Sequence, residues 1–477
     1  MPVNRLTKTV STPGSPLDRF FQLSERGSTL GREVRGGVAT FFTMAYILVL
    51  NPIILSGATD VHGNQLSVEQ VLTVTALVAG IMTILMGLTA NLPLALAAGL
   101  GINAMVAFQI APLMSWPDAM GLVVLEGLLL CVISLTGFRE AVMTAIPMAL
   151  KQAIGVGIGL FIALIGFVNA GFTTGHAGSP PLSLGANGEL TGWPMLVFCV
   201  GLLLTLALLA RKVKGAILIS IVVTTVFAMI VNAVADVPGE AWGLTAPSWP
   251  DALVAAPDFN LVGEFSLFGA FGEISAITVL LIVFTLFLTD FFDTMGTAVG
   301  VTSEAGLLDK EGRVPRLGRL LFVDGLAAAA GGAASASSNT SYVESAAGVG
   351  EGARTGLANL VTGALFGIAL FLSPIATVVP AQAAAPALVA VGFLMMAHVA
   401  QINWSDHALG IPAFVTIAVM PFTFSITNGI GAGFVAYVVL KCVTGRFREI
   451  NWLVWITTLL FLVYFAIDPL RQLLGVD

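Results

Sequence analysis

The sequence FLTDFFDTMGT at residues 287–297 places Asp290 and Asp293 inside a long apolar run. Further along the chain, ASASSNTSYVESAAG at residues 334–348 interrupts the apolar pattern and leads Glu344 into a second apolar run. Carboxyl groups at membrane depth are costly and are rarely retained without a use. These two segments are therefore the predicted centre of the functional site.

The composition indicates a membrane protein. Of 477 residues, 57% are hydrophobic and 10% are charged, and the mean hydropathy is +0.96. A soluble protein carries about a quarter charged residues. At about 20 residues per crossing, there is room for more than ten helices. The 3 cysteines and 4 histidines are scattered, so neither a metal site nor a cofactor is predicted.

Basic residues fall in tight groups along the chain. Residues 36–138, 152–210 and 215–309 contain no Lys or Arg. The positive-inside rule places every basic group in the cytoplasm. The Arg-bearing segment 1–35 has no apolar core, so it is interpreted as a cytoplasmic leader and not as a cleaved signal peptide.

The apolar runs predict an all-α polytopic membrane protein with fourteen spans. They fall at about 36–55, 70–88, 93–113, 119–137, 152–171, 193–210, 215–235, 270–297, 319–334, 339–351, 354–373, 381–400, 410–427 and 429–444. Seven spans in each half would place a second copy upside down in the membrane, which is the signature of an inverted-repeat transporter. Comparable segments beginning at Pro147 and Pro380 support the duplication.

The predicted domain organisation follows from these spans. Residues 36–235 form the first repeat, 236–268 an extracytoplasmic connector, and 269–444 the second repeat. Residues 445–477 form a cytoplasmic tail. Within the tail, the hydrophobic segment 452–467 is expected to lie along the cytoplasmic face or dip into it, because a full crossing would place Arg471 outside.

Spans 3 and 10 are predicted to be broken. Gly99 and Gly101 precede Asn103, and the residues from Gly331 to Glu344 are almost all small or polar. Such composition disfavours helix, and non-helical backbone at membrane depth must be buried in protein or line a cavity. Interrupted spans at corresponding places point to a transporter's binding site. Asn103 and Glu344 would each start a half-helix whose N–H groups face a ligand; alternatively, Glu344 only caps its helix.

Asp290 and Asp293 share one helix face because they are three residues apart. No Lys or Arg lies inside a predicted span, so an ion pair is not expected. A carboxyl group without a basic partner suits proton coupling. Asp290 is favoured as the ligand or proton site, and Asp293 is expected to orient the surrounding loops. Thr294 begins a stretch that permits close packing.

Three other residues have weaker assignments. Glu126 in span 4 is either a partner behind the site or a helix-packing hydrogen bond, and the sequence leaves both open. Asp324 is interpreted as an ion-pair partner of Arg319 near the inner surface. Tyr342 is a candidate stacking surface for a flat ligand.

The chain resembles the AzgA-like hypoxanthine–adenine–guanine permeases, a purine branch of the nucleobase–cation symporters. The resemblance extends from about residue 20 to 450, and four motifs carry it. These are GLGIN (99–103), TDFFDTMGT (289–297), GLLDKEGRVPRLGR (306–319) and TSYVESAAGVGEGARTGL (340–357). Uracil- and xanthine-type relatives have Gly before and Asn after the span-10 acid. In this chain Val343 and Ser345 occupy those two positions, which favours the purine branch over uracil or xanthine permeases.

The resemblance implies a uracil-permease-like architecture. Spans 1–4 and 8–11 would form a core domain and spans 5–7 and 12–14 a gate domain, with short strands in spans 3 and 10. It further implies a homodimer in the bacterial inner membrane, whose core moves against its gate. The substrate-binding or coupling residues would be Asn103, Asp290, Asp293 and Glu344.

We therefore predict proton-coupled import of purine nucleobases, with protons favoured over sodium. Glu344 and Asp290 would hold the base, and protonation of one of them would couple import to the proton gradient. No cofactor, enzymatic activity or nucleic-acid partner is expected. An anion exchanger or channel of the same architecture is disfavoured by the acids. An intramembrane hydrolase is disfavoured because there is no HExxH motif and the paired aspartates share one helix.

Overall fold

The computed structural model describes residues 15–136, 145–175, 182–185, 188–243, 245–250, 252–309 and 313–466. In the first half, the principal elements are α1 (Pro16–Phe21), α2 (Leu30–Met44), α3 (Ile47–Ser56), α4 (Val68–Thr89), β1 (Leu96–Ala98), α5 (Leu100–Met105), α6 (Trp116–Leu135), α8 (Met148–Asn169), α9 (Trp193–Ala210) and α10 (Ala216–Ala235). A π-helical turn, Val106–Ile110, extends α5. A small hairpin of β2 (Thr173–Gly175) and β3 (Leu182–Leu184) follows α8.

The second half repeats this order of elements. It comprises α11 (Ala270–Glu273), α12 (Ala276–Glu304), α13 (Leu317–Ala333), β4 (Asn339–Ser341), α14 (Ser345–Gly350), α15 (Leu357–Ala369), α16 (Ser373–Ala376), α17 (Ala381–Met396), α18 (His407–Phe422), α19 (Ile426–Val443) and α20 (Trp452–Phe465). Pro147 and Pro380 are the N-cap residues of α8 and α17, as their shared segments predicted.

Each predicted span contains a helix, and the fold is helical as expected. Among the residues that the structure describes, nine helical segments are long and apolar enough to cross a membrane. The other five predicted spans hold shorter helices, so the count of fourteen crossings stays a prediction. The largest shift is in span 8, where α12 runs from Ala276 to Glu304 and makes Asp290 its middle residue.

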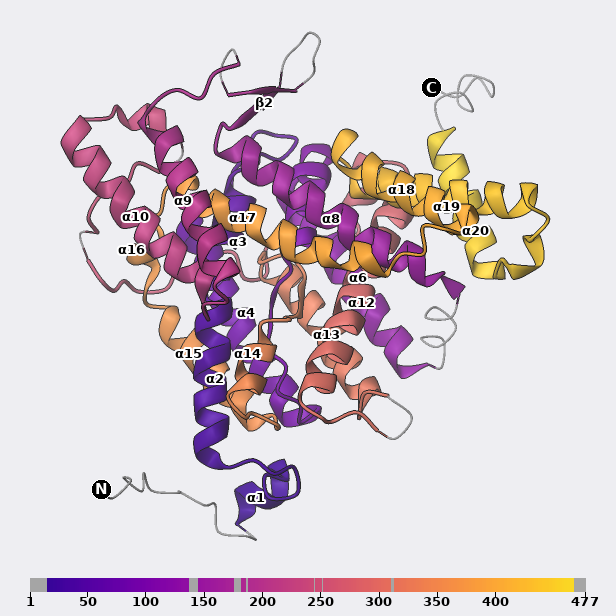
Figure 1. Ribbon diagram of the computed structural model, residues 1–477, viewed down its shortest axis with the longest axis horizontal. Coiled ribbons are helices and arrows are strands. Elements are labelled where there is room, and N and C mark those ends of the chain that lie inside the picture. The colour runs from indigo at the N-terminus through magenta and orange to yellow at the C-terminus, as the bar shows by residue number, and fades with distance from the viewer. Residues whose placement is uncertain are drawn as a thin grey trace.

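The helix contacts show the internal duplication. α6 packs on α13 and α4 packs on α15; α17 packs on α9 and α18 packs on α8. If each span of the first half is replaced by its counterpart in the second half, and the reverse, the α6–α13 contact becomes the α15–α4 contact. In the same way, the α9–α17 contact becomes the α18–α8 contact. In Figure 1, α8, α17, α18 and α19 cross the upper part of the molecule, whereas α2, α13, α14 and α15 lie below them. This grouping follows the expected gate and core domains.

Glycines allow the helices to cross at close range. A Cβ at Gly159 in α8 would lie 2.8 Å from the carbonyl oxygen of Gly392 in α17. A Cβ at Gly363 in α15 would lie 2.6 Å from the carbonyl oxygen of Gly80 in α4. Without a hydrophobic driving force between helices in lipid, such small-residue contacts are a principal source of packing.

The two broken spans meet as a pair of short strands. β1 and β4 are antiparallel, with Leu96 opposite Ser341, Ala97 opposite Thr340 and Ala98 opposite Asn339. All six residues are buried. The strands predicted by the family resemblance are thus confirmed. The pairing lets backbone groups that leave the helical ladder satisfy one another at membrane depth.

The C-terminal hydrophobic segment packs against the last span of the second half. α20 runs back along α19, with Phe461 stacked on Phe434 at a ring separation of 6.3 Å. Gly431, near the start of α19, packs against Phe461 and Phe465. The contact fixes the segment against α19, and its predicted placement along the cytoplasmic face stays a prediction. Residue 467 and Arg471, on which its predicted topology depends, fall outside the described residues.

Substituting Ala for Gly159 should destabilise the protein, whereas the same change at Gly155 should not. The new methyl group at 159 meets the α17 backbone, and overpacking costs about 1–3 kcal/mol. At Gly155, in the same helix, a Cβ has nothing within 4 Å. Thermal unfolding of the purified protein in detergent measures both. Equal melting temperatures for the two variants would contradict this account of the crossing.

Candidate functional site

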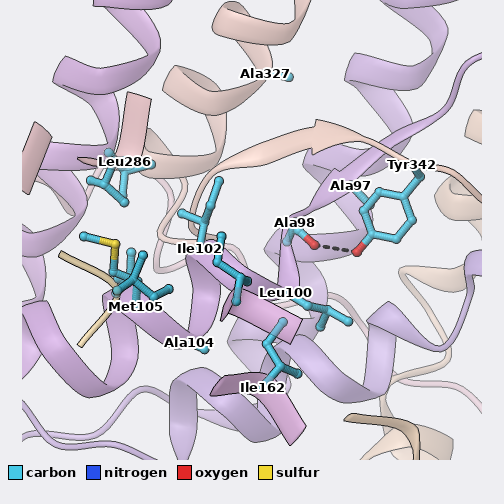
Figure 2. Close-up of a cluster of buried hydrophobic side chains, with 14 of the residues drawn as sticks. Ala97, Ala98, Leu100, Ile102, Ala104, Met105, Ile162, Leu286, Ala327 and Tyr342 are labelled. Atoms are coloured by element: carbon cyan, nitrogen blue, oxygen red, sulfur yellow. Dashed lines mark hydrogen bonds between the residues drawn. The ribbon is translucent and has the colours of Figure 1, made fainter. Parts of the chain in front are cut away.

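The paired strands are the centre of the site. The backbone N–H of Tyr342 donates to the carbonyl of Ala95 at 2.9 Å, and the Tyr342 hydroxyl donates to the carbonyl of Ala98 at 2.5 Å. The Ala95 N–H in turn donates to Ser345 Oγ at 2.9 Å. Figure 2 shows the Tyr342 ring lying beside β1, with its hydroxyl on Ala98. Tyr342 and Ser345 therefore connect span 10 to span 3 through side-chain hydrogen bonds.

Glu344 is the N-cap residue of α14, but its side chain makes no capping hydrogen bond. Its carboxylate instead accepts a hydrogen bond from the hydroxyl of Tyr46. Tyr46 lies at the break between α2 and α3, and Thr43 just before it donates to the Glu344 carbonyl at 3.3 Å. Glu344 is half-buried, unlike Asp290, Glu126 and Asp324, which are completely buried. The structure gives no support to a role limited to capping.

The two aspartates of α12 have different surroundings. Asp290 is completely buried, and its Oδ2 accepts from the Ser338 hydroxyl at 3.3 Å. Asp293 is exposed and lies near enough to Asp290 and Glu344 to interact with both electrostatically. Thr294, one residue on, shares a 2.7 Å hydrogen bond with the hydroxyl of Thr340 in β4. Asp293 and Glu344 are therefore less buried than Asp290.

Asn103 is buried, and neither its Oδ1 nor its Nδ2 has a hydrogen-bond partner. It lies in the short helix α5, which packs on α8 through Gly101 and Ile158. An unpartnered buried amide costs about 1–3 kcal/mol, so its retention points to a use. The positions of Asn103 and Glu344 are not strictly equivalent, because Asn103 is inside α5 and Glu344 precedes α14.

Two further carboxyls lie behind β4. Glu126 Oε2 accepts from Ser338 Oγ at 3.2 Å, and Asp324 Oδ1 accepts from Ser341 Oγ at 3.0 Å. Both acids are completely buried. The predicted ion pair between Asp324 and Arg319 is wrong, because Asp324, five residues after Arg319 along α13, is buried against Ser341 of β4 whereas Arg319 is exposed. Of the two alternatives for Glu126, the structure favours a partner of Asp290 behind the site, because Ser338 links the two.

A basic residue lies nearer the site than predicted. α8 starts at Met148, so Lys151 falls in its first turn and not before the span. The Lys151 Nζ is 5.2 Å from the ring centre of Phe292, the neighbour of Asp293. This contact joins the α8 side of the molecule to α12.

Sequence reasoning missed Tyr46 and Ser338. Tyr46 sits in an ordinary apolar run, and the only available signal is that the chain has just 4 tyrosines. Ser338 lies among other serines and threonines, and nothing in the sequence shows that its hydroxyl reaches two acids. The Tyr46–Glu344 and Ser338–Glu126 contacts each join residues more than 200 positions apart in the chain. The Ser338–Asp290 contact joins residues 48 positions apart.

Comparison with known proteins gives consistent matches. The permease family model (Xan_ur_permease) matches residues 31–432. The chain is 38% identical to adenine permease AdeP of Escherichia coli, over 95% of this chain and 97% of that protein. It is also 38% identical to guanine/hypoxanthine permease PbuG of Bacillus subtilis, over 94% of this chain and 98% of that protein.

Solved structures share the fold at low sequence identity. The transmembrane domain of a cyanobacterium bicarbonate transporter, BicA, has a TM-score of 0.57 at 16% identity, covering 84% of this chain and 97% of that chain. The murine Solute Carrier 26 family member A9 anion transporter has a TM-score of 0.58 at 12% identity, covering 93% and 74%. These matches establish the fold alone. From the sequence matches, this multi-pass membrane protein belongs to the permease family.

Proposed function

We propose that the protein imports purine nucleobases by proton symport, with an elevator-type movement of its core against its gate. Adenine permease AdeP and guanine/hypoxanthine permease PbuG match nearly the whole chain, which supports a purine substrate. The observation that carries the proposal is the half-buried acid Glu344, whose carboxylate is anchored by Tyr46 beside the β1–β4 pair.

The chemistry of the site suits a purine. A purine presents N–H donors and ring-nitrogen acceptors along one edge. Glu344 and Asp293 supply acceptors for the donors, and the unpartnered amide of Asn103 can both donate and accept. Tyr342 offers a ring for stacking while its hydroxyl stays on β1. In this proposal Asp293 takes the base-contacting role expected for Asp290, because Asp293 is exposed whereas Asp290 is completely buried and its Oδ2 already accepts from Ser338. Asn103 is equally buried, but both atoms of its amide are without a partner.

An anion does not fit this site, although the structures of similar fold are anion transporters. Glu344 and Asp293 would repel a bicarbonate or chloride ion by an amount that a single distant lysine does not offset. The likeness in fold at 16% identity or less leaves substrate choice to the site residues.

The proposed movement uses the boundary between the two groups of helices. On one side, Lys214 in the α9–α10 turn pairs with Glu351 at the end of α14. Elsewhere, Gln109 after α5 accepts from the Ile426 N–H at the start of α19 at 2.9 Å. Both contacts cross from core to gate and would have to break. We further propose a homodimer in the bacterial inner membrane, with its N-terminus in the cytoplasm and the repeat boundaries given above.

Uptake into proteoliposomes tests the proposal. Labelled guanine, hypoxanthine, adenine and uracil are supplied with an inward proton gradient, with and without an uncoupler. At least one purine should accumulate, uracil should not, and the uncoupler should abolish accumulation. Glu344→Gln should lower purine uptake by about tenfold or more, because a hydrogen bond to a charged group is worth about 1.5–3 kcal/mol.

Glu304→Gln is the matched control, since Glu304 is exposed at the end of α12. It should transport like the wild type. Proton-dependent purine uptake by Glu344→Gln at the wild-type level would defeat the proposed site, and uptake of uracil in place of purines would defeat the proposed substrate.

Tyr46→Phe should raise the KM for the purine by about tenfold, because the hydrogen bond that positions the Glu344 carboxylate is lost. The maximal rate should change less than KM, since the acid itself remains. Tyr464→Phe is the control: within the described residues the Tyr464 hydroxyl makes no hydrogen bond. A KM unchanged by Tyr46→Phe would show that Tyr46 does not position the acid.

A further inference from the structure

We propose that Glu126, Asp290 and Asp324 form a buried site that holds the coupled proton, separate from the nucleobase-binding Glu344 and Asp293. This inference rests on the proposed function and changes one part of it. The proton is held behind β4, and the base is held in front of it.

Three different helices supply the carboxyls. Glu126 comes from α6, Asp290 from the middle of α12, and Asp324 from α13. Two serines of the span-10 strand region hold them together. Ser338 donates to both Glu126 and Asp290, at 3.2 and 3.3 Å, and Ser341 donates to Asp324 at 3.0 Å.

The hydrogen-bond donors at this site are too few for three carboxylates. Each acid keeps one oxygen with no donor: Glu126 Oε1, Asp290 Oδ1 and Asp324 Oδ2. The Ser338 hydroxyl carries a single proton and cannot fully satisfy the two acids that it contacts. All three residues are 0% exposed. These inward-facing, unpartnered oxygens are the observation that points to a bound cation or proton.

The Glu126 and Asp290 carboxyls are close neighbours, because Ser338 Oγ lies 3.2 Å from one and 3.3 Å from the other. Two carboxyl groups that share a buried site disfavour each other's ionisation. The geometry therefore favours a proton on one of the pair.

Among the described residues, no basic side chain is one of the groups that interact with the three acids. Lys151 of α8, which packs against α12, lies over the Phe292 ring. The titratable groups that interact with the three acids are one another, Asp293 on α12 and Cys131 on α6. The neighbouring helix α4 contributes only Glu69, which accepts from Ser373 at 3.3 Å. Three negative charges without a partner are not tolerated in a buried site.

The geometry favours protons over a metal ion. No group of three or more Asp, Glu, His or Cys among the described residues is arranged to hold a metal. A carboxylate that takes up a proton becomes a neutral acid, and it returns to the carboxylate when the proton leaves. No oxidant, reductant or other reactant is needed, and one proton can accompany one nucleobase.

The position of β4 explains how the two sites would communicate. Ser338 and Ser341 bind the acids, and the same segment continues into Tyr342 and Glu344. Asp290 and Asp293 are one helical turn apart on α12. Gain or loss of the proton changes which oxygens the two serines can donate to, and it thereby shifts the strand that presents Glu344.

The experiment compares wild type, Glu126→Gln, Asp324→Asn and the control Glu304→Gln in proteoliposomes. Nucleobase binding and proton-driven accumulation are measured separately with labelled guanine, hypoxanthine and adenine. With an inward gradient of about one pH unit, one-to-one symport sustains about tenfold accumulation. The wild type and the control should reach this ratio. The two cluster variants should still bind the base but should not accumulate it above equilibrium.

The outcomes separate this inference from the proposed function. A wild type that neither binds nor transports any purine defeats the proposed function. Cluster variants that accumulate purine like the wild type overturn the proton site alone, as does a wild type driven by a sodium gradient at equal pH. If neither variant folds, infrared spectroscopy of the wild type decides: a band from a protonated buried carboxyl that Glu344→Gln retains supports the site, and no such band overturns it.

Discussion

The structure depends on one constraint: backbone polar groups at membrane depth must find partners within the protein. Spans 3 and 10 both leave the helical ladder, and each is the partner of the other through β1 and β4. Side chains complete the pairing, since the Tyr342 hydroxyl and Ser345 Oγ bind backbone groups of span 3. Any residue that follows these strands is therefore held in a fixed place, and Glu344 is such a residue.

The strand pair also divides the acids into two groups. On one side, Glu344 is half-buried and Asp293 is exposed. On the other, Glu126, Asp290 and Asp324 are fully buried against the serines of the β4 region. An accessible carboxylate is suited to contact a polar ligand, whereas a buried group of acids without a basic partner is suited to hold a proton. β4 supplies Ser341 to the buried acids and continues through Tyr342 to Glu344, so one short segment contacts both groups.

Local patterns predicted most of the fold. Each predicted apolar run contains a helix, Pro147 and Pro380 marked equivalent helix starts, and the small-residue composition of span 10 predicted its break. The orientation of side chains was less predictable. Spacing placed Asp290 and Asp293 on one face of a helix, but a separation of three residues still lets one face β4 and the other face accessible space. Partners such as Tyr46 come from distant parts of the chain, and only the packing of the helices brings them in.

A structure of the protein with a bound purine, determined by electron cryo-microscopy in a lipid nanodisc, tests the central claim most directly. The account predicts that the base contacts Glu344, Asp293 and Asn103, while the Asp290 carboxyl stays against Glu126 and Ser338. A base bound by Asp290, with its carboxyl withdrawn from Glu126 and no contact to Glu344, would contradict the division of the acids into a base site and a proton site.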